Sequence, residues 1–139
     1  YRFDITELTN KLRSGVQTPV LMLESHSTDL APNANKTVTF ANRRISFLLM
    51  NFAGKVDNYD LKEQVLDELE VIALDICTFL KKCSDDRTHW LYGMIDLQTV
   101  QVEKVGPLMD NMYGWNVIYT LKNHEPMCYD ATKWEWPTP

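Results

Sequence analysis

The chain has 139 residues, of which 45% are hydrophobic and 24% charged, values ordinary for one globular domain. A domain of this size buries enough surface to fold without disulfide or metal staples, and this composition argues against full-length disorder. The net charge is −5 and the basic residues are scattered, so we expect no sequence-specific binding to nucleic acid, which relies on a basic stripe.

Cysteine usage and apolar runs indicate a cytosolic environment. Three cysteines at irregular spacing, Cys77, Cys83 and Cys128, do not form the even framework of a secreted disulfide protein, so we expect reduced thiols. No charged segment followed by an apolar core marks a signal peptide. The longest wholly apolar runs, of which Phe47–Met50 is one, have only four residues and are too short to span a membrane, so no membrane association is expected.

The first third of the chain predicts a helix, a strand and a loop. Apolar residues at i, i+3 and i+7 predict a short amphipathic helix near residues 3–14. Val16–His26 carries an almost unbroken apolar run that predicts a strand covered on both faces. Ser27–Lys36 is rich in Pro, Asn and small polar residues and is expected to be a loop.

Residues 37–52 predict one extended strand or a strand pair. Apolar residues alternate on both sides of Ala41–Arg44, where the break in rhythm predicts a bulge or bend. Beyond that break both faces of the strand are apolar. The strand is therefore either central in its sheet, or one of its faces meets a partner.

The strongest periodic signal predicts a long helix over about residues 59–83. Its apolar residues step by three or four positions, which is helical spacing, and Asp57 or Asn58 can cap its start. The stripe consists of Leu61, Val65, Leu69, Ile72, Ile76 and Leu80.

The second half of the chain predicts a β-hairpin and then an irregular tail. Residues 89–97 fit either a strand or a helical turn, and residues 100–105 predict a strand that ends at a Gly-Pro pair. Strict alternation over residues 113–121 predicts the second strand of the hairpin. We therefore expect one domain over residues 1–122 and an irregular tail over residues 123–139.

These elements together predict an α+β fold. The expected sheet is mainly antiparallel or mixed, has four or more strands, and is covered by the helix at about 59–83 and by the short N-terminal helix.

No residue pattern predicts a catalytic, cofactor or metal site. Phosphate-binding glycine loops and the G-x-S-x-G motif are absent from the sequence, so we expect neither an enzyme nor a cofactor. The three histidines, His26, His89 and His124, lie in separate segments without a close pair of ligands.

The order of elements resembles the tail terminator and neck proteins of long-tailed bacteriophages. The segments that carry the resemblance are Thr18–Glu24 after a short helix, the helix over 59–83, and Val102–Leu121. The resemblance implies a homo-oligomeric ring, usually a hexamer, at the head–tail junction. Such a ring terminates the tail tube, docks to the head connector, lets DNA pass through its lumen, and lies in the virion after assembly in the host cytoplasm.

Three segments are candidate subunit contacts for such a ring: the doubly apolar strand, the polar loop and the tail. Tryptophan is enriched at interfaces, although the tail can equally fold back over its own sheet. The candidate interface residues are Phe47, Leu49, Phe52, Leu30, Asn33, Tyr129, Trp134 and Trp136.

Two other functions stay open at the level of sequence. One is a small enzyme whose site is assembled from scattered residues such as His89, Asp96 and Tyr113. The other is a small-molecule or peptide-binding module that uses the aromatic strand around Trp115 and Tyr119 as its platform.

Overall fold

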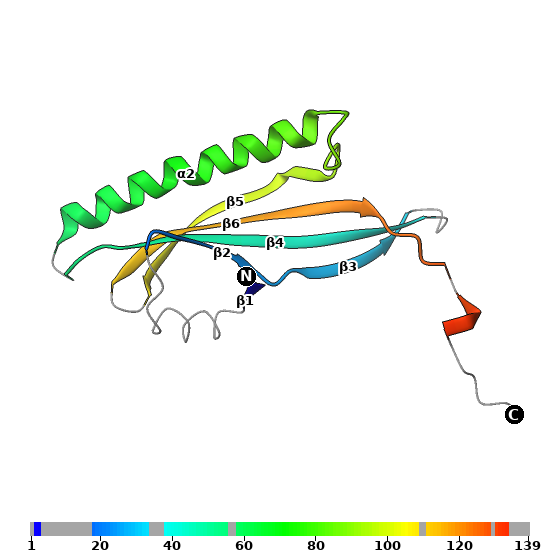
Figure 1. Ribbon diagram of the computed structural model, residues 1–139, viewed down its shortest axis with the longest axis horizontal. Coiled ribbons are helices and arrows are strands. Elements are labelled where there is room, and N and C mark those ends of the chain that lie inside the picture. Colours follow the sequence, from blue (N-terminus) through cyan, green and yellow to red (C-terminus); the bar gives the residue numbers. More distant parts are fainter. Residues whose placement is uncertain are drawn as a thin grey trace, which may run out of the picture.

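The described residues of this α+β protein form one α-helix and a six-stranded sheet. The helix lies on one face of the sheet, as Figure 1 shows. The sheet confirms the predicted fold class and the predicted majority of antiparallel strands. The computed structural model describes residues 2–3, 18–33, 38–55, 58–108, 111–128 and 130–133.

The centre of the sheet is a pair of neighbouring strands, β4 (Thr39–Phe52) and β6 (Met112–His124). They pair antiparallel along almost their whole length without a shift in register. Strand β5 (Ile95–Leu108) pairs antiparallel with β6, which confirms the predicted hairpin, and it forms one edge of the sheet.

The other side of β4 pairs with two short strands in succession. Strand β2 (Val20–Glu24) pairs with one end of β4, and β3 (Ser27–Pro32) pairs with the other end. Ser25 and His26 interrupt what is otherwise one continuous edge. Strand β1 (Arg2–Phe3) adds to β2 in parallel orientation.

Helix α2 (Tyr59–Asp85) confirms the helix that the apolar spacing predicts over about residues 59–83. The Asn58 side-chain oxygen accepts a hydrogen bond of 3.1 Å from the Leu61 amide, so Asn58 caps the first turn. Buried residues of α2, among them Val65 and Leu69, pack against the sheet.

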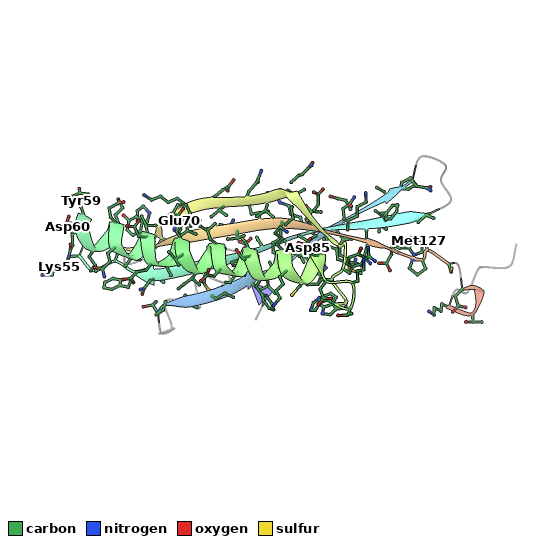
Figure 2. The ribbon with its side chains drawn as sticks, turned by 90° about the horizontal axis from the view of Figure 1, so that it is seen from above. Lys55, Tyr59, Asp60, Glu70, Asp85 and Met127 are labelled. Atoms are coloured by element: carbon green, nitrogen blue, oxygen red, sulfur yellow. The ribbon has the colours of Figure 1, made fainter. Side chains whose placement is uncertain are left out.

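The position of α2 follows from the order of the strands. The helix connects β4 to β5, and β6 lies between those two strands. Because β4 and β5 are each antiparallel to β6, they run parallel to each other, and a parallel connection must cross over a face of the sheet. Figures 1 and 2 show α2 lying along that face.

Both faces of β4 are buried, as expected for a central strand. Phe47 and Leu49, 4% and 5% exposed, lie beneath α2 in the main core with Val117 of β6. Leu48 and Met50 point to the opposite face and belong to a second buried cluster. The first of the two alternatives for this strand is thus confirmed.

The prediction of a loop over Ser27–Lys36 is wrong for the first part of that range, because residues 27–32 form β3. These residues are mostly exposed, as an outer strand allows, and their backbone pairs with β4. Asn33 closes the hairpin: its amide donates to the Val38 carbonyl at 2.8 Å, and its side-chain oxygen accepts from the Val38 amide at 3.2 Å.

The prediction of a bulge at Ala41–Arg44 is also wrong, because β4 keeps one register with both β3 and β6 through these residues. Strand β5 begins at Ile95, which settles residues 95–97 as strand and leaves 89–94 as turns. Strand β6 runs to His124, two residues beyond the predicted domain boundary.

Two expectations for the ends of the chain meet the described residues only in part. The predicted helix near 3–14 lies outside them, except that Phe3 belongs to β1. In the predicted irregular tail, Ala131–Lys133 forms a short 3-10 helix, η1.

Gly114 is expected to be essential for the central pairing. A Cβ added at Gly114 would lie 1.7 Å from the Leu49 carbonyl oxygen, which cannot move without shifting β4. Gly114→Ala should therefore lower the free energy of unfolding by about 3 kcal/mol or more in chemical denaturation. Gly93→Ala is the matched control, because nothing lies within 4 Å of its added Cβ and only its φ of +66° opposes the change.

The control substitution should cost about 1 kcal/mol, the penalty of a left-handed residue with a side chain. Equal losses for the two variants would show that close contact at Gly114 does not constrain the β4–β6 pairing.

Candidate functional site

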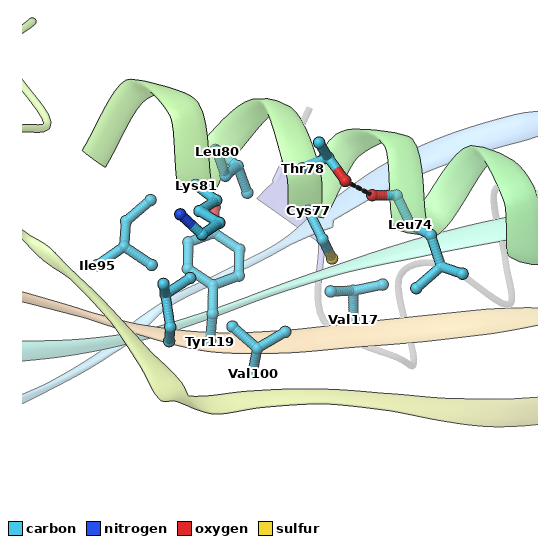
Figure 3. A pocket seen from close by; sticks show the side chains of 10 residues that line it. Leu74, Cys77, Thr78, Leu80, Lys81, Ile95, Val100, Val117 and Tyr119 are labelled. Carbon is cyan, nitrogen blue, oxygen red and sulfur yellow. Dashed lines mark hydrogen bonds between the residues drawn. The ribbon is translucent and has the colours of Figure 1, made fainter. Parts of the chain in front are cut away.

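An apolar groove lies between the C-terminal half of α2 and the β5–β6 hairpin, with a volume of about 410 Å³. Figure 3 shows side chains of the helix on one side of it and side chains of the strands on the other. Its lining includes Leu74, Cys77, Leu80, Leu97, Val100 and Tyr119.

The groove lies where β5 leaves its regular pairing with β6. Asp96 pairs with Thr120 and Gln101 pairs with Ile118, so residues 97–100 lie opposite Tyr119 alone. Extra residues in one strand bend it locally, as in a β-bulge. Two of the residues in this segment, Leu97 and Val100, line the groove.

Side-chain hydrogen bonds replace the missing ladder at this irregularity. The Thr99 hydroxyl accepts from the Thr120 amide at 2.9 Å and donates to the Asp96 carbonyl at 2.7 Å. The Asp96 carboxylate also accepts from the Gln98 amide at 3.1 Å. The bulge is therefore a bonded conformation that satisfies backbone groups which the ladder no longer pairs.

Two ionisable groups in the groove are held in their neutral forms. Burial raises the pKa of the Cys77 thiol. Burial raises the pKa of the Tyr119 hydroxyl as well, and the negative charge of an ionised Cys77 adds to the rise. Both groups are protonated at neutral pH, so neither adds a negative charge to the groove, which Lys81 also lines.

These pKa shifts predict a loss of stability at alkaline pH. The folded chain keeps protons on Cys77 and Tyr119 at pH values where the unfolded chain has released them, so the free energy of unfolding falls as pH rises above about 9, the ordinary thiol value. Denaturation titrations between pH 7 and 11 measure this slope. Cys77→Ala combined with Tyr119→Phe should flatten it, and an unchanged slope would contradict the assignment.

Thr99→Val should destabilise the bulge because it leaves the Thr120 amide without its acceptor, at a cost of about 1–2 kcal/mol in the free energy of unfolding. Thr78→Val is the matched control, since the Thr78 hydroxyl only donates to the Leu74 carbonyl within α2. Denaturant unfolding of both variants tests this, and a loss at Thr99 no larger than at Thr78 would count against a supporting role.

Three exposed aromatic side chains come from the last turns of α2 and from the turn that follows it. We call them the aromatic surface and define it by Phe79, Trp90 and Tyr92, of which Phe79 is 63% and Trp90 71% exposed. Aromatic side chains are enriched among the residues that contribute most to protein–protein contacts.

The turn that carries Trp90 is held by several local contacts. The Asp86 carboxylate accepts hydrogen bonds from the Thr88 amide and hydroxyl, which lower the pKa of Asp86. His89 Nδ1 accepts from the Leu91 amide at 3.2 Å, and the His89 ring stacks on Trp90 with centroids 5.8 Å apart. Leu91 is buried against Cys83 and Ile95, which fastens the turn to the body of the protein.

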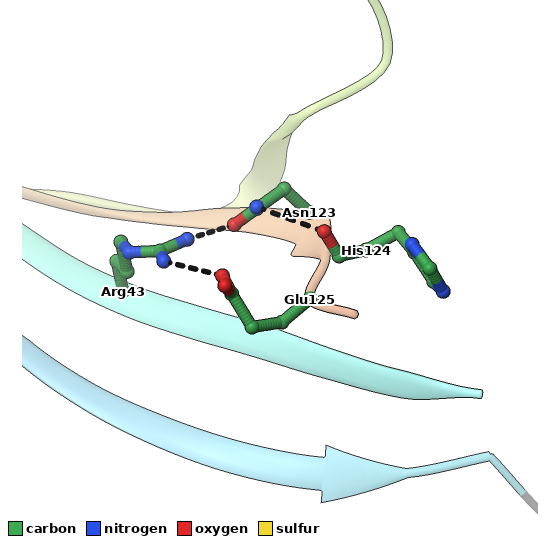
Figure 4. A network of polar contacts seen from close by, with 4 residues as sticks. All are labelled: Arg43, Asn123, His124 and Glu125. Carbon is green, nitrogen blue, oxygen red and sulfur yellow. Dashed lines mark hydrogen bonds and ion pairs between the residues drawn. The ribbon is translucent and has the colours of Figure 1, made fainter. Parts of the chain in front are cut away.

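A polar network holds the chain where it leaves the sheet after β6 (Figure 4). Arg43 of β4 donates to the Asn123 side-chain oxygen and forms an ion pair of 2.7 Å with Glu125. The Glu125 amide also donates to the Thr39 carbonyl at 2.9 Å. The residues that follow thus leave from a defined point at the end of the sheet.

The candidate interface residues fall into three groups in the structure. Phe47 and Leu49 are buried beneath α2, so they are not surface residues of this fold. Phe52 and Leu30 are each 50% exposed, and Asn33 is half-buried in the β3–β4 hairpin. The three tail candidates, Tyr129, Trp134 and Trp136, lie outside the described residues.

The structure separates the residues named for a scattered enzyme site. Asp96 pairs near the end of β6, seven strand residues from Tyr113, a distance of roughly 23 Å. Tyr113 packs with Ala53 and Leu66 near the start of α2. Trp115 is not an open platform either, because its indole donates to the Leu66 carbonyl at 2.9 Å beneath the helix.

Sequence reasoning missed both apolar surfaces, although α2 carried a signal. Leu74 lies outside the periodic stripe of the helix, and an apolar residue outside a core stripe points to contacts beyond the core. Phe79 follows Ile72 by seven residues at the edge of the stripe, yet its side chain is exposed. Ile72 was assigned to the stripe and is partly exposed. The groove depends on the bulge in β5, which the alternation of residues does not reveal.

Within the part of the chain that the structure describes, no group of three or more His, Cys, Asp and Glu side chains is placed to hold a metal ion. None of the helices in these residues combines the length and apolar composition that crossing a bilayer requires. Comparison of the chain with protein-family models, with curated proteins and with solved structures finds no match.

Proposed function

We propose that this chain is a structural subunit that assembles into a ring at the head–tail junction of a long-tailed bacteriophage. The observation that carries the proposal is the presence of two separate apolar surfaces, the groove and the aromatic surface, on one subunit. The phage context comes from the resemblance of the element order.

The two surfaces lie on different sides of α2. Phe79 is five residues beyond Leu74, which is a rotation of roughly 140° around the helix. A subunit with two such surfaces can contact two different neighbours at once. A ring that also docks onto other proteins needs this arrangement, because one surface meets the next copy and another meets the tail-tube or connector protein.

The charge of the chain fits a ring through which DNA passes. The net charge is −5, and like charge repels the phosphates, so DNA would move through the lumen without being gripped. The partners in this proposal are further copies of the chain, the tail-tube protein and the head connector. The place of action is the virion, after assembly in the host cytoplasm.

A second candidate function is a module that binds a small molecule or a peptide. The observation that favours it is the groove itself, whose volume of about 410 Å³ lies within the range of ligand pockets, about 300–1,000 Å³. A subunit that remains monomeric and binds an apolar ligand beside Tyr119 would support this alternative over the ring.

Light scattering coupled to size exclusion tests the ring. The wild-type chain should show a discrete mass near six times the 16.2 kDa subunit, alone or with tail-tube protein. Leu74→Glu places a charge in the groove and should shift the mass towards the monomer. Val71→Glu is the matched control, because Val71 is an exposed apolar residue of α2 outside the groove and the aromatic surface.

Phe79→Glu should leave the mass of the assembly unchanged. It should weaken the affinity for tail-tube or connector protein at least about tenfold, because one aromatic side chain buried at an interface commonly contributes that much to binding. A strict monomer that ignores both proteins would contradict the proposed function.

A further inference from the structure

We infer that the groove between α2 and β5 is a peptide-binding site whose occupant is the segment Lys133–Trp136 of a second copy of this chain. The inference rests on the proposed assembly and names the contact that would join neighbouring subunits.

The first argument is the free edge beside the groove. Strand β5 is the last strand in the order of the sheet, so no described strand pairs with its outer side. An outer strand with unpaired amide and carbonyl groups accepts an added strand from another chain. A strand added here would lie next to the residues of β5 that line the groove.

The second argument is the pattern of the segment. Trp134 and Trp136 alternate with Lys133 and Glu135. In an extended strand alternate side chains point to opposite faces, so both indoles would lie on one face and both charges on the other. An apolar groove above a sheet requires this separation of apolar and charged side chains.

The third argument is the complementary pattern of β5. Val100 and Val102 pack against the core beneath α2, whereas Gln101 and Glu103 are exposed. An antiparallel strand with Lys133 opposite Glu103 places Trp134 beside Val102 and Trp136 beside Val100, which lines the groove.

The charges favour this orientation. In the antiparallel register Lys133 faces Glu103 and Glu135 faces the neutral Gln101. A parallel strand with its indoles beside the same two valines also sets Glu135 opposite Gln101, but it places Lys133 opposite the neutral Thr99. It therefore lacks the pair of opposite charges that stabilises two neighbouring strands. Lys133 forms an exposed ion pair with Asp130 at 3.5 Å, which is weak and easily exchanged.

The position of η1 favours a second copy over the same copy as the donor. Figure 1 shows η1 beyond the end of the sheet and on the side away from α2. Trp136 is three residues from Lys133 and can therefore extend only about 10 Å beyond it. The groove of the same subunit lies on the other side of the sheet, next to α2, so the segment of a second copy is the better donor. A segment given by one subunit to the next produces the head-to-tail contact from which rings are built.

The test uses the full chain with Trp134→Ala and Trp136→Ala as the host and a fluorescent synthetic peptide of residues 130–139 as the probe. Fluorescence anisotropy should show saturable binding. Leu97→Glu in the host should weaken it at least about tenfold, since Leu97 is an exposed residue of the groove, and Val71→Glu should not. Absence of peptide binding, or equal losses in these two hosts, would overturn the inference.

A charge exchange tests the register. Glu103→Lys in the host should weaken binding of the wild-type peptide. Lys133→Glu in the peptide should restore binding to that host. If the exchanged charges do not restore binding, the antiparallel register is wrong.

Light scattering separates this inference from the proposed function. The wild-type chain should assemble, and the Trp134→Ala, Trp136→Ala chain should have a lower mass. If the double variant assembles like the wild type, the segment is not the contact, although the ring stands. If the wild type is monomeric and only the double variant binds peptide, the segment occupies the groove of its own chain, which overturns exchange between copies.

Discussion

The pairing of β4 with β6 is the constraint on which the rest of the structure depends. The two strands keep one register over their shared length, and Gly114 permits the approach because any Cβ there would collide with the Leu49 carbonyl. With β6 between β4 and β5, the connection from β4 to β5 must cross a face of the sheet, so α2 covers that face. The main core around Phe47, Leu49 and Val117 is the result.

The groove arises where this regularity ends. Residues 97–100 of β5 have only Tyr119 opposite them, and the hydroxyl of Thr99 supplies the hydrogen bonds that the ladder lacks. The irregular pairing of this segment places Leu97 and Val100 in the lining of the groove beneath α2. A local departure from ideal pairing thus produces an apolar surface beside a free strand edge, and bulges are often found next to functional sites.

The sequence predicted the elements whose signals are local and failed where long-range pairing decides. The spacing of Leu61, Val65 and Leu69 predicted α2, and strict alternation predicted β6, because each pattern reflects one buried face. Residues 27–32 have the composition of a loop, but backbone pairing with β4 makes them an outer strand. The groove could not be predicted, since it requires the register of β5 against β6 as well as the position of α2 above both strands.

In the proposed head-to-tail association, the segment Lys133–Trp136 of one copy binds in the groove of the next copy. The most direct measurement mixes two assembly-defective chains, one with Leu74→Glu in the groove and one with Trp134→Ala and Trp136→Ala. Each mixture partner retains the surface that the other lacks, so light scattering should detect a 1:1 complex of about twice 16.2 kDa that neither chain forms alone. A mixture in which both chains remain monomeric would contradict this association.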